Sequence, residues 1–254
     1  MESIRKPFQG VVNIVRFNWH FYVLSAAFVL LMLILSLYLN KPFSLYLVIL
    51  SIIITAVFVT SLLTSFYVYD LSNLYKLSWL DLLPKFDGAK ILNINAGFDE
   101  TSALLNNKFP GAAITVFDFY DPIKHTEVSI KRARKAYPPY PGTQKIITSV
   151  LPLPDDYADK VFLILAAHEI RNEEERIVFF KELNRVLKPR GQVVVTEHLR
   201  DIPNFLAYNI GFLHFFPKRT WKNVFAGSGF VITKEIKITP FITTFILEKN
   251  GTAS

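Results

Sequence analysis

The pattern of apolar and polar positions divides the chain into two unlike parts. Two long stretches near the N-terminus, residues 19–39 and 44–69, contain no charged residue. Each is longer than the roughly 20 residues that a helix needs to cross a bilayer, and only residues 40–43 (NKPF) separate them. The pattern therefore predicts a transmembrane helical hairpin over residues 19–69, preceded by a short N-terminal segment, residues 1–18.

Two other interpretations of these stretches fit less well. A buried hairpin of a soluble helical core would keep a polar stripe along each helix, and a cleaved signal peptide would have a shorter apolar run before a small-residue cleavage site. Arg5, Lys6 and Arg16 precede the first stretch, whereas the connecting loop holds only Lys41. By the positive-inside rule we expect an integral membrane protein with two spans, both termini and the whole C-terminal domain being cytosolic.

Beyond the hairpin, the pattern alternates between strands and helices. Strands are expected at residues 90–95, 113–119, 145–148, 160–166, 192–197, 230–238 and 241–249, and helices at residues 99–108, 123–136, 172–187 and 218–226. Such alternation implies a mostly parallel sheet covered on both faces. The last two strands are joined too tightly for a crossover and must be antiparallel. The predicted fold class is α/β, a doubly wound, mostly parallel Rossmann-like sheet that ends in an antiparallel hairpin and occupies residues 90–254.

The segment between the hairpin and this domain, residues 70–89, is expected to be a connector helix. Its leucines recur at helical spacing, at positions 71, 74, 77 and 80. Packing against the domain core is the simplest role for such a stripe. Together the patterns predict four parts, residues 1–18, 19–69, 70–89 and 90–254.

Composition narrows the function classes. The chain has 254 residues, no cysteine, 19% charged residues and a mean hydropathy of +0.31. So few charges exclude a disordered chain, and the lack of cysteine excludes a disulfide scaffold, a thiolate zinc site and a cysteine nucleophile. The net charge of +7 suits contact with an anionic lipid surface.

Two consecutive segments of the domain carry a family resemblance. Residues 151–170 (LPLPDDYADKVFLILAAHEI) and residues 174–198 (EERIVFFKELNRVLKPRGQVVVTEH) are similar to patterns of the class I S-adenosylmethionine-dependent methyltransferases, nearest to their type 11 branch. Arg190 replaces one glycine of that pattern. The resemblance extends over about residues 90–249 and implies S-adenosyl-L-methionine as the cofactor.

The resemblance implies a cofactor site after the first strand. Where the family has a loop with three glycines, residues 91–99 are ILNINAGFD, and only Gly97 is kept. The implied cofactor-binding residues of this loop are Asn93, Asn95, Ala96 and Gly97. Asparagine tolerates left-handed backbone angles better than most residues, so Asn95 is expected to keep the turn.

Further implied contacts lie at the ends of the next strands. Asp118 takes the place of the acid that binds both ribose hydroxyls, and Phe119 that of the side chain beside adenine. Ser149 and Val150 correspond to the loop that touches adenine, and Ala166 lies beneath the cofactor. An acid at position 118 would also suit a dinucleotide enzyme, but the sequence has no GxGxxG motif.

Methyl transfer needs little acid–base chemistry, because the sulfonium methyl group is already activated and alignment does most of the work. A general base helps when the acceptor is a hydroxyl, a phenol or a carbon acid. His168 is the first candidate and His198 the second, with a structural, hydrogen-bonded histidine as the alternative for each. The five histidines, at positions 20, 125, 168, 198 and 214, show no metal-binding spacing, so we expect no metal.

A basic run over residues 124–135 invites a nucleic-acid interpretation. A solvated helix face and contact with anionic phospholipid are the alternatives, and the membrane hairpin makes nucleic acid the less suitable partner. Lys131 and Arg134 belong to this run and are expected to leave cofactor binding unaffected. The aromatic segment 203–216 lies where the family has its acceptor lid; it suits an apolar pocket, the bilayer or simple core packing.

These inferences together predict a membrane-anchored S-adenosylmethionine-dependent methyltransferase. Its partners would be membrane lipids and a lipophilic or membrane-associated small-molecule acceptor. The alternative is a non-catalytic membrane-anchored module with a degenerate methyltransferase fold, which the loss of loop glycines favours.

Overall fold

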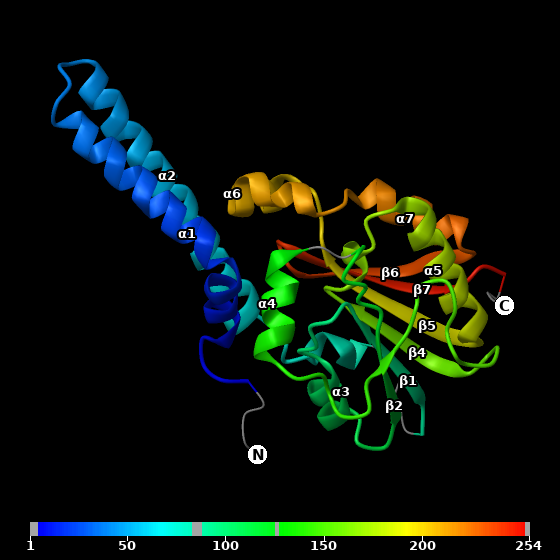
Figure 1. The fold of residues 1–254 in the computed structure, drawn as a ribbon. Coiled ribbons are helices and arrows are strands. Elements are labelled where there is room, and N and C mark those ends of the chain that lie inside the picture. The colour runs from blue at the N-terminus through cyan, green and yellow to red at the C-terminus, as the bar shows by residue number, and fades with distance from the viewer. Residues whose placement is uncertain (1–4, 83–87, 125–126, 252–254) are drawn as a thin grey trace.

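The computed structural model describes residues 5–82, 88–124 and 127–251. Two long helices, α1 (Gln9–Ser36) and α2 (Phe43–Phe66), form a hairpin that projects from an α/β domain (Figure 1). Both helices are long and apolar enough to cross a bilayer, and few residues of their apolar stretches are fully buried within the protein. The helical hairpin predicted over residues 19–69 is therefore present.

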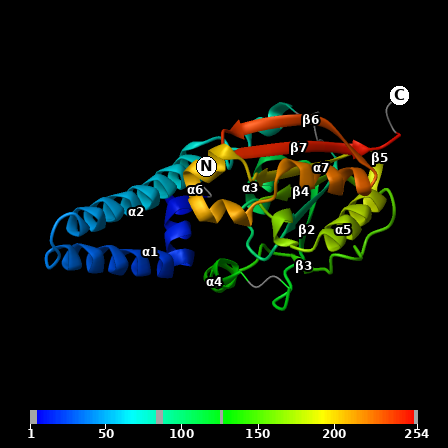
Figure 2. The same cartoon turned by 90° about the horizontal axis from the view of Figure 1, so that it is seen from above.

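Helix α1 has two parts that meet at Asn18. This residue has non-helical angles (φ −116°, ψ 18°), and its side-chain amide donates to the carbonyl of Ile14 at 3.1 Å. The turns before it bend away from the rest of the helix (Figure 2). Near the helix start, the backbone N–H groups of Gly10 and Val11 donate to the carboxylate of Asp70 at 2.7 and 2.8 Å. Since the first N–H groups of a helix have no partners within the helix, Asp70 fixes this end of α1 to the chain that follows the hairpin.

The connector differs from the single helix expected over residues 70–89. A π-helical turn, η1 (Tyr67–Leu71), ends where Ser72 becomes extended, and a short 3₁₀ helix, η2 (Ser78–Leu82), follows. Leu77 has a positive φ of 54°, which interrupts any continuous helix. The leucines at positions 74, 77 and 80 are buried in the domain core, whereas Leu71 is exposed. Core packing therefore explains most of the leucine stripe; residues 83–87 lie outside the described residues.

The sheet has the predicted mixed topology. Its strands are β1 (Lys90–Asn95), β2 (Ala113–Asp118), β3 (Gln144–Lys145), β4 (Ala158–Ile164), β5 (Leu187–His198), β6 (Phe230–Thr239) and β7 (Ile242–Lys249). Their order in the sheet is β3-β2-β1-β4-β5-β7-β6. All neighbours are parallel except β7, which is antiparallel to both β5 and β6. The predicted fold class is confirmed.

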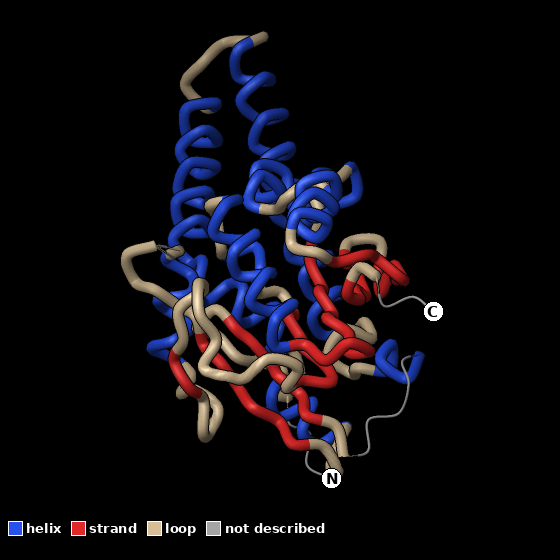
Figure 3. The backbone as a smooth tube through the Cα atoms, turned by 90° about the vertical axis from the view of Figure 1, so that its right-hand side faces the viewer, coloured by secondary structure: helices blue, strands red, loops and turns tan. Residues whose placement is uncertain are grey.

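Helices cover both faces of this sheet, and the hairpin stands away from it (Figure 3). The helices of the domain are α3 (Ser102–Lys108), α4 (Val128–Ala136), α5 (Glu173–Val186), α6 (Ile202–Tyr208) and α7 (Lys218–Gly227), with short 3₁₀ helices η3 (Ala167–Glu169) and η4 (Asn209–His214). Helix α3 begins later than expected because the Asp99 carboxylate accepts the N–H groups of Thr101 and Ser102. Two buried apolar clusters result, and one of them includes Leu74 and Trp79 of the connector.

Candidate active site

A cavity of about 210 Å³ lies where the C-terminal ends of β1 and β4 meet the first turns of α1. Asn95 and Ala96 line it from the loop after β1, and His168 and Glu169 line it from the segment after β4. The remaining wall comes from outside the sheet and includes Gly10, Asn13, Ile14, Phe17 and Asn18 of α1. The carboxyl ends of parallel strands are where doubly wound sheets bind ligands, and here a helix of the hairpin helps to enclose that place.

The loop after β1 keeps a tight turn despite its lost glycines. The Asn95 side-chain oxygen accepts the N–H of Gly97 at 3.0 Å, and Gly97 has a φ of +94°. The other atom of that side chain, Asn95 Nδ2, is buried and has no hydrogen-bond partner within the described residues. A buried donor without an acceptor is unfavourable, so this amide is available to a bound molecule. Asn93 is different, because its amide donates to Thr101 and Ser102 at 2.9 and 2.7 Å and so supports α3.

Asp118, at the end of β2, is buried and already has two partners. One carboxylate oxygen accepts the N–H of Tyr120 at 2.8 Å, and the other lies 2.5 Å from Nη1 of Arg134. The same nitrogen donates to the Gly97 carbonyl at 3.3 Å, and a Cβ added to Gly97 would lie 2.5 Å from it. The Arg134 guanidinium therefore covers both the acid and the glycine that the sequence assigned to the cofactor. Only a space of about 40 Å³ remains beside them.

The other implied cofactor residues do not gather around the 210 Å³ cavity. Phe119 is in the core, with its ring centroid 5.5 Å from that of Phe179. Ser149 and Val150 are exposed on the surface, and Ala166 is buried in the core. None of these four lines the cavity, so their predicted contacts with a cofactor remain predictions.

His168 belongs to a dense group of charged side chains. Its Nδ1 lies 2.6 Å from Oε2 of Glu197, and its Nε2 lies 3.1 Å from Oε1 of Glu169. Burial alone would lower the pKa of His168, but Glu197 and Glu169 outweigh it and raise the pKa to about 10. His214 joins the group from η4, with Nε2 3.6 Å from the same Glu169 oxygen. At neutral pH an imidazole with this pKa holds its proton, so in this state His168 is a hydrogen-bond donor and not a base.

His198 lies in a different environment from His168. Its ring is buried between the Tyr69 hydroxyl, 2.8 Å from Nε2, and the Asn204 side-chain oxygen, 2.9 Å from Nδ1, and it stacks on Phe215. Burial lowers the pKa of His198 to about 4. The ring ties β5 to the connector and to α6, and it does not line the 210 Å³ cavity. These contacts fit the structural alternative for His198.

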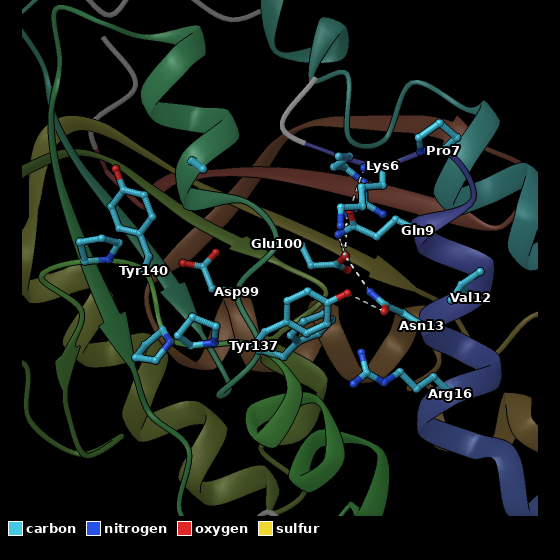
Figure 4. Close-up of a pocket in the computed structure, with 16 residues that line it drawn as sticks. Lys6, Pro7, Gln9, Val12, Asn13, Arg16, Asp99, Glu100, Tyr137 and Tyr140 are labelled. Carbon is cyan, nitrogen blue, oxygen red and sulfur yellow. Dashed lines mark hydrogen bonds and ion pairs between the residues drawn. The ribbon is translucent and has the colours of Figure 1, made fainter. Parts of the chain in front are cut away.

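A second, larger cavity of about 530 Å³ opens between the start of α1 and the loop after α4. Lys6 and Arg16 line it from the N-terminal side, and Tyr140 lies across from them (Figure 4). Asn13 accepts a hydrogen bond from the Tyr137 hydroxyl at 2.9 Å, which links the two sides. The cavity therefore combines cationic side chains, the carboxylates of Asp99 and Glu100, and aromatic and proline surfaces at the base of the hairpin.

Several residues of the site were not singled out from the sequence. They are Arg134 on the cofactor side, Glu169, Glu197 and His214 around His168, and the α1 residues of the cavity wall. Parallel strands bring their C-terminal ends together. Glu169 follows β4 and Glu197 lies near the end of β5, so this signal was available for both acids. His214 lies in an irregular segment, and α1 is distant in the sequence. The sequence pattern does not predict where either of them packs against the sheet.

Comparison with known proteins gives two kinds of similarity. Residues 93–195 match a family model described as "Methyltransferase domain". A SAM-dependent methyltransferase from Aquifex aeolicus is similar in structure, with a TM-score of 0.50, 16% identity, and coverage of 70% of this chain and 89% of that one. A protein from Pyrococcus horikoshii gives a TM-score of 0.52 with the same identity and coverage. No curated protein matches the sequence.

Proposed function

We propose, since residues 93–195 match a methyltransferase domain, that the chain is a membrane-anchored enzyme that uses S-adenosylmethionine. Its methyl acceptor would be a lipophilic or membrane-associated small molecule, and its catalytic domain would lie on the cytosolic side. The cofactor would supply an activated methyl group, and the protein's task would be to align an acceptor with it.

The residues after β1 fit such a cofactor. Asn95 offers a buried amide nitrogen without a partner, at a cavity that is bounded by the turn holding Gly97. A carboxylate or hydroxyl of the cofactor would satisfy this donor. Asp118 carries the acceptor oxygens that ribose hydroxyls require, but Arg134 must move away from it first. In this proposal Asn95 and Asp118 would hold the cofactor, and the Arg134–Asp118 ion pair would have to open before it binds.

One observation carries the proposal: the 210 Å³ cavity is lined by both the methyltransferase domain and α1. Phe17 and Asn18 in its wall directly precede the apolar part of α1, residues 19–36. A molecule dissolved at the membrane surface would therefore lie close to the strand ends where methyl transfer occurs. An enzyme whose membrane helices served only as an anchor would not need one of them in the wall of its active site.

Helix α6 supports the same proposal. It contacts α2, and together with η4 it exposes a group of large apolar side chains: Ile202, Phe205, Leu206, Ile210 and Leu213. Exposed apolar patches beside apolar helices are typical of membrane contact. Lys6 and Arg16 in the 530 Å³ cavity would favour an anionic headgroup there. The segment 203–216 would thus lie at the bilayer surface, as a cover over the acceptor.

Two measurements test the proposal. Full-length protein in detergent should bind S-adenosylmethionine by calorimetry, and vesicles containing it should transfer a labelled methyl group from the cofactor to a lipid-extractable product. Binding without any labelled product from a total membrane lipid extract would argue against a lipophilic acceptor.

The proposed orientation has its own test. Protease added to the cytosolic side of sealed vesicles should digest the domain after Leu71 and leave a fragment of two spans. Protection of the domain from that side would overturn the orientation that Arg5, Lys6 and Arg16 suggest.

The Arg134–Asp118 ion pair favours a second candidate, a non-catalytic membrane module. An arginine at the ribose position would then be a permanent occupant of the cofactor site. This candidate requires that millimolar S-adenosylmethionine gives neither heat nor thermal stabilisation, also after Arg134 is removed.

A further inference from the structure

Three side chains, two from η3 after β4 and one from the end of η4, converge on one point. Nε2 of His168 lies 3.1 Å from Oε1 of Glu169, and Nε2 of His214 lies 3.6 Å from that same oxygen. One ligand atom from each of the three residues lies within 4.8 Å of the other two. Ligand atoms about 2.1 Å from a common ion lie about 3.0 Å apart at a right angle and about 3.4 Å apart at a tetrahedral angle. The two spacings to the Glu169 oxygen, 3.1 and 3.6 Å, are close to this range.

Both histidines also have a carboxylate on their other ring nitrogen. Nδ1 of His168 lies 2.6 Å from Glu197, and Nδ1 of His214 lies 3.3 Å from Glu127. Metal-binding histidines almost always donate their second N–H to a carboxylate, a carbonyl or water, which fixes the ring and frees the other nitrogen for the ion. Glu197 is almost completely buried and also accepts the backbone N–H of His168 at 3.2 Å. The orientation of the first ring is therefore well fixed.

We propose that His168, Glu169 and His214 bind a divalent transition-metal ion, which would displace the proton between His168 and Glu169, and that Zn²⁺ suits the site best. Two imidazole nitrogens and one carboxylate oxygen are the ligands of a well-known type of catalytic zinc site. Mg²⁺, which prefers oxygen ligands, suits it poorly. The absence of a metal was expected from the linear spacing of the histidines; the cluster instead assembles in space from β4 and the segment after β5.

The position of the cluster gives the ion a place in the chemistry. His168 and Glu169 line the 210 Å³ cavity, and three protein ligands leave at least one coordination position for another molecule. An ion here would bind an acceptor through an oxygen atom. The site would thus select an acceptor with a hydroxyl or carboxylate oxygen, whatever the length of its apolar part.

The test uses full-length protein in detergent, purified with an affinity tag that contains no histidine and treated with a chelator. Calorimetry with Zn²⁺ should give one site per chain. His168→Ala, Glu169→Gln and His214→Ala should each weaken binding by more than about 100-fold, and Glu127→Gln by roughly 10–100-fold, the usual effect of losing an outer carboxylate. His20→Ala, a histidine of α1 away from the cluster, should leave the affinity unchanged.

A spectroscopic measurement still tests the proposed metal site if the variants of buried residues fail to fold. His214 is partly exposed on η4, so His214→Ala is the variant least able to disturb the core. Co²⁺ bound to wild type should give visible d–d absorption, and His214→Ala should lose it. The proposal is overturned if wild type takes up no Zn²⁺ at micromolar concentration, or if His20→Ala weakens binding as much as His214→Ala does. The cluster would then be a metal-free network of ion pairs.

Discussion

The ends of β1 and β2 and the ends of β4 and β5 meet at one edge of the sheet, yet their side chains are organised differently. At β1 and β2, a single side chain, Arg134, covers Asp118 and the turn at Gly97. At β4 and β5, His168 and Glu197 belong to a buried network in which each charge faces an opposite one. The first region would have to open before it could bind the proposed cofactor, whereas the second would need little rearrangement to bind the proposed metal ion. Two neighbouring parts of the same sheet edge would thus differ in how far their side chains rearrange when a ligand binds.

The largest effect expected at the β1–β2 end comes from Gly97→Val. A branched side chain is strained at a φ of +94°, and its Cβ would lie 2.5 Å from Arg134 and 2.9 Å from Cβ of Tyr120. We expect cofactor binding to fall by more than about 100-fold, or about 2.8 kcal/mol, in calorimetry. The β4–β5 network should keep its structure, because it lies on other strands.

Gly142→Val is the matched control for that variant. Gly142 has a similar φ of +79°, but nothing lies within 4 Å of an added Cβ. It therefore reproduces the backbone strain without the contact with Arg134. Equal losses of cofactor affinity in both variants would mean that strain, and not filling of the site, explains the effect of Gly97→Val.

Acid should weaken the β4–β5 end through His198. Burial lowers its pKa to about 4, while in the unfolded chain the value is about 6.5. The unfolded state therefore binds a proton first as the pH falls, so stability is complete above pH 6.5 and is lost between pH 6.5 and 4. The loss should be about 3 kcal/mol. Tyr69 and Tyr208 contact the ring, and nearby His168 and His214 also disfavour its protonation.

Thermal unfolding in detergent across this pH range measures the effect, with His198→Gln as the comparison. Glutamine does not titrate, so the variant should lose less stability than wild type between pH 6.5 and 4. Identical pH dependence in the two proteins would contradict a neutral, buried His198.

The smallest expected effect comes from a variant that tests whether the Arg134 side chain blocks the proposed cofactor site. Arg134→Ala should raise cofactor affinity about tenfold, because binding no longer has to break an ion pair worth about 1.4 kcal/mol. Asp118→Ala should lower the affinity by about tenfold or more, since it removes the oxygens that are proposed to bind the ribose. Calorimetry on the folded variants measures both changes.

Lys131→Ala is the control on the same helix. Lys131 is exposed on α4 and makes no described ion pair with the site, so its removal should change nothing. The sequence alone predicted this neutral outcome for Arg134 as well; the contact with Asp118 changes that expectation. A lower affinity for Arg134→Ala would mean that the guanidinium helps to hold the cofactor.

The fold was predictable because its signals are local. Alternation of apolar runs with helical periodicity predicts the strands and the helices α3, α4, α5 and α7, and the short Thr239-Pro240 link imposes the antiparallel ending. It did not predict α6, and it placed the third strand at residues 145–148, whereas β3 is Gln144–Lys145. The connector was not predictable, because the leucine spacing is equally compatible with a helix and with the turns that Ser72 and Leu77 form. Leucines at this spacing can reach the core even when the backbone between them is not a continuous helix.

The site was predictable only as far as strand ends define it. The ends of β1, β2 and β4 come together in this topology, and at or just after them lie Asn95, Gly97, Asp118 and His168. Arg134 looked like one cation among several on a solvated helix, and only the packing of α4 over the loop after β1 distinguishes it. His214 lies in an irregular segment whose path depends on contacts far away in the sequence. The positions of such side chains depend on long-range packing, which the periodicity of the sequence does not specify.

The bend of α1 at Asn18 has a kinetic consequence. The turns before it are hydrogen-bonded to Asp70 and form a wall of the proposed active site. If α1 spans a bilayer as proposed, the helix itself would set the height of the site above it. An acceptor that arrives along the membrane is diluted by neighbouring lipid and not by water. Turnover would then follow the mole fraction of acceptor in the bilayer. Adding inert lipid at a constant amount of acceptor would slow the reaction, while changing the volume of buffer would not.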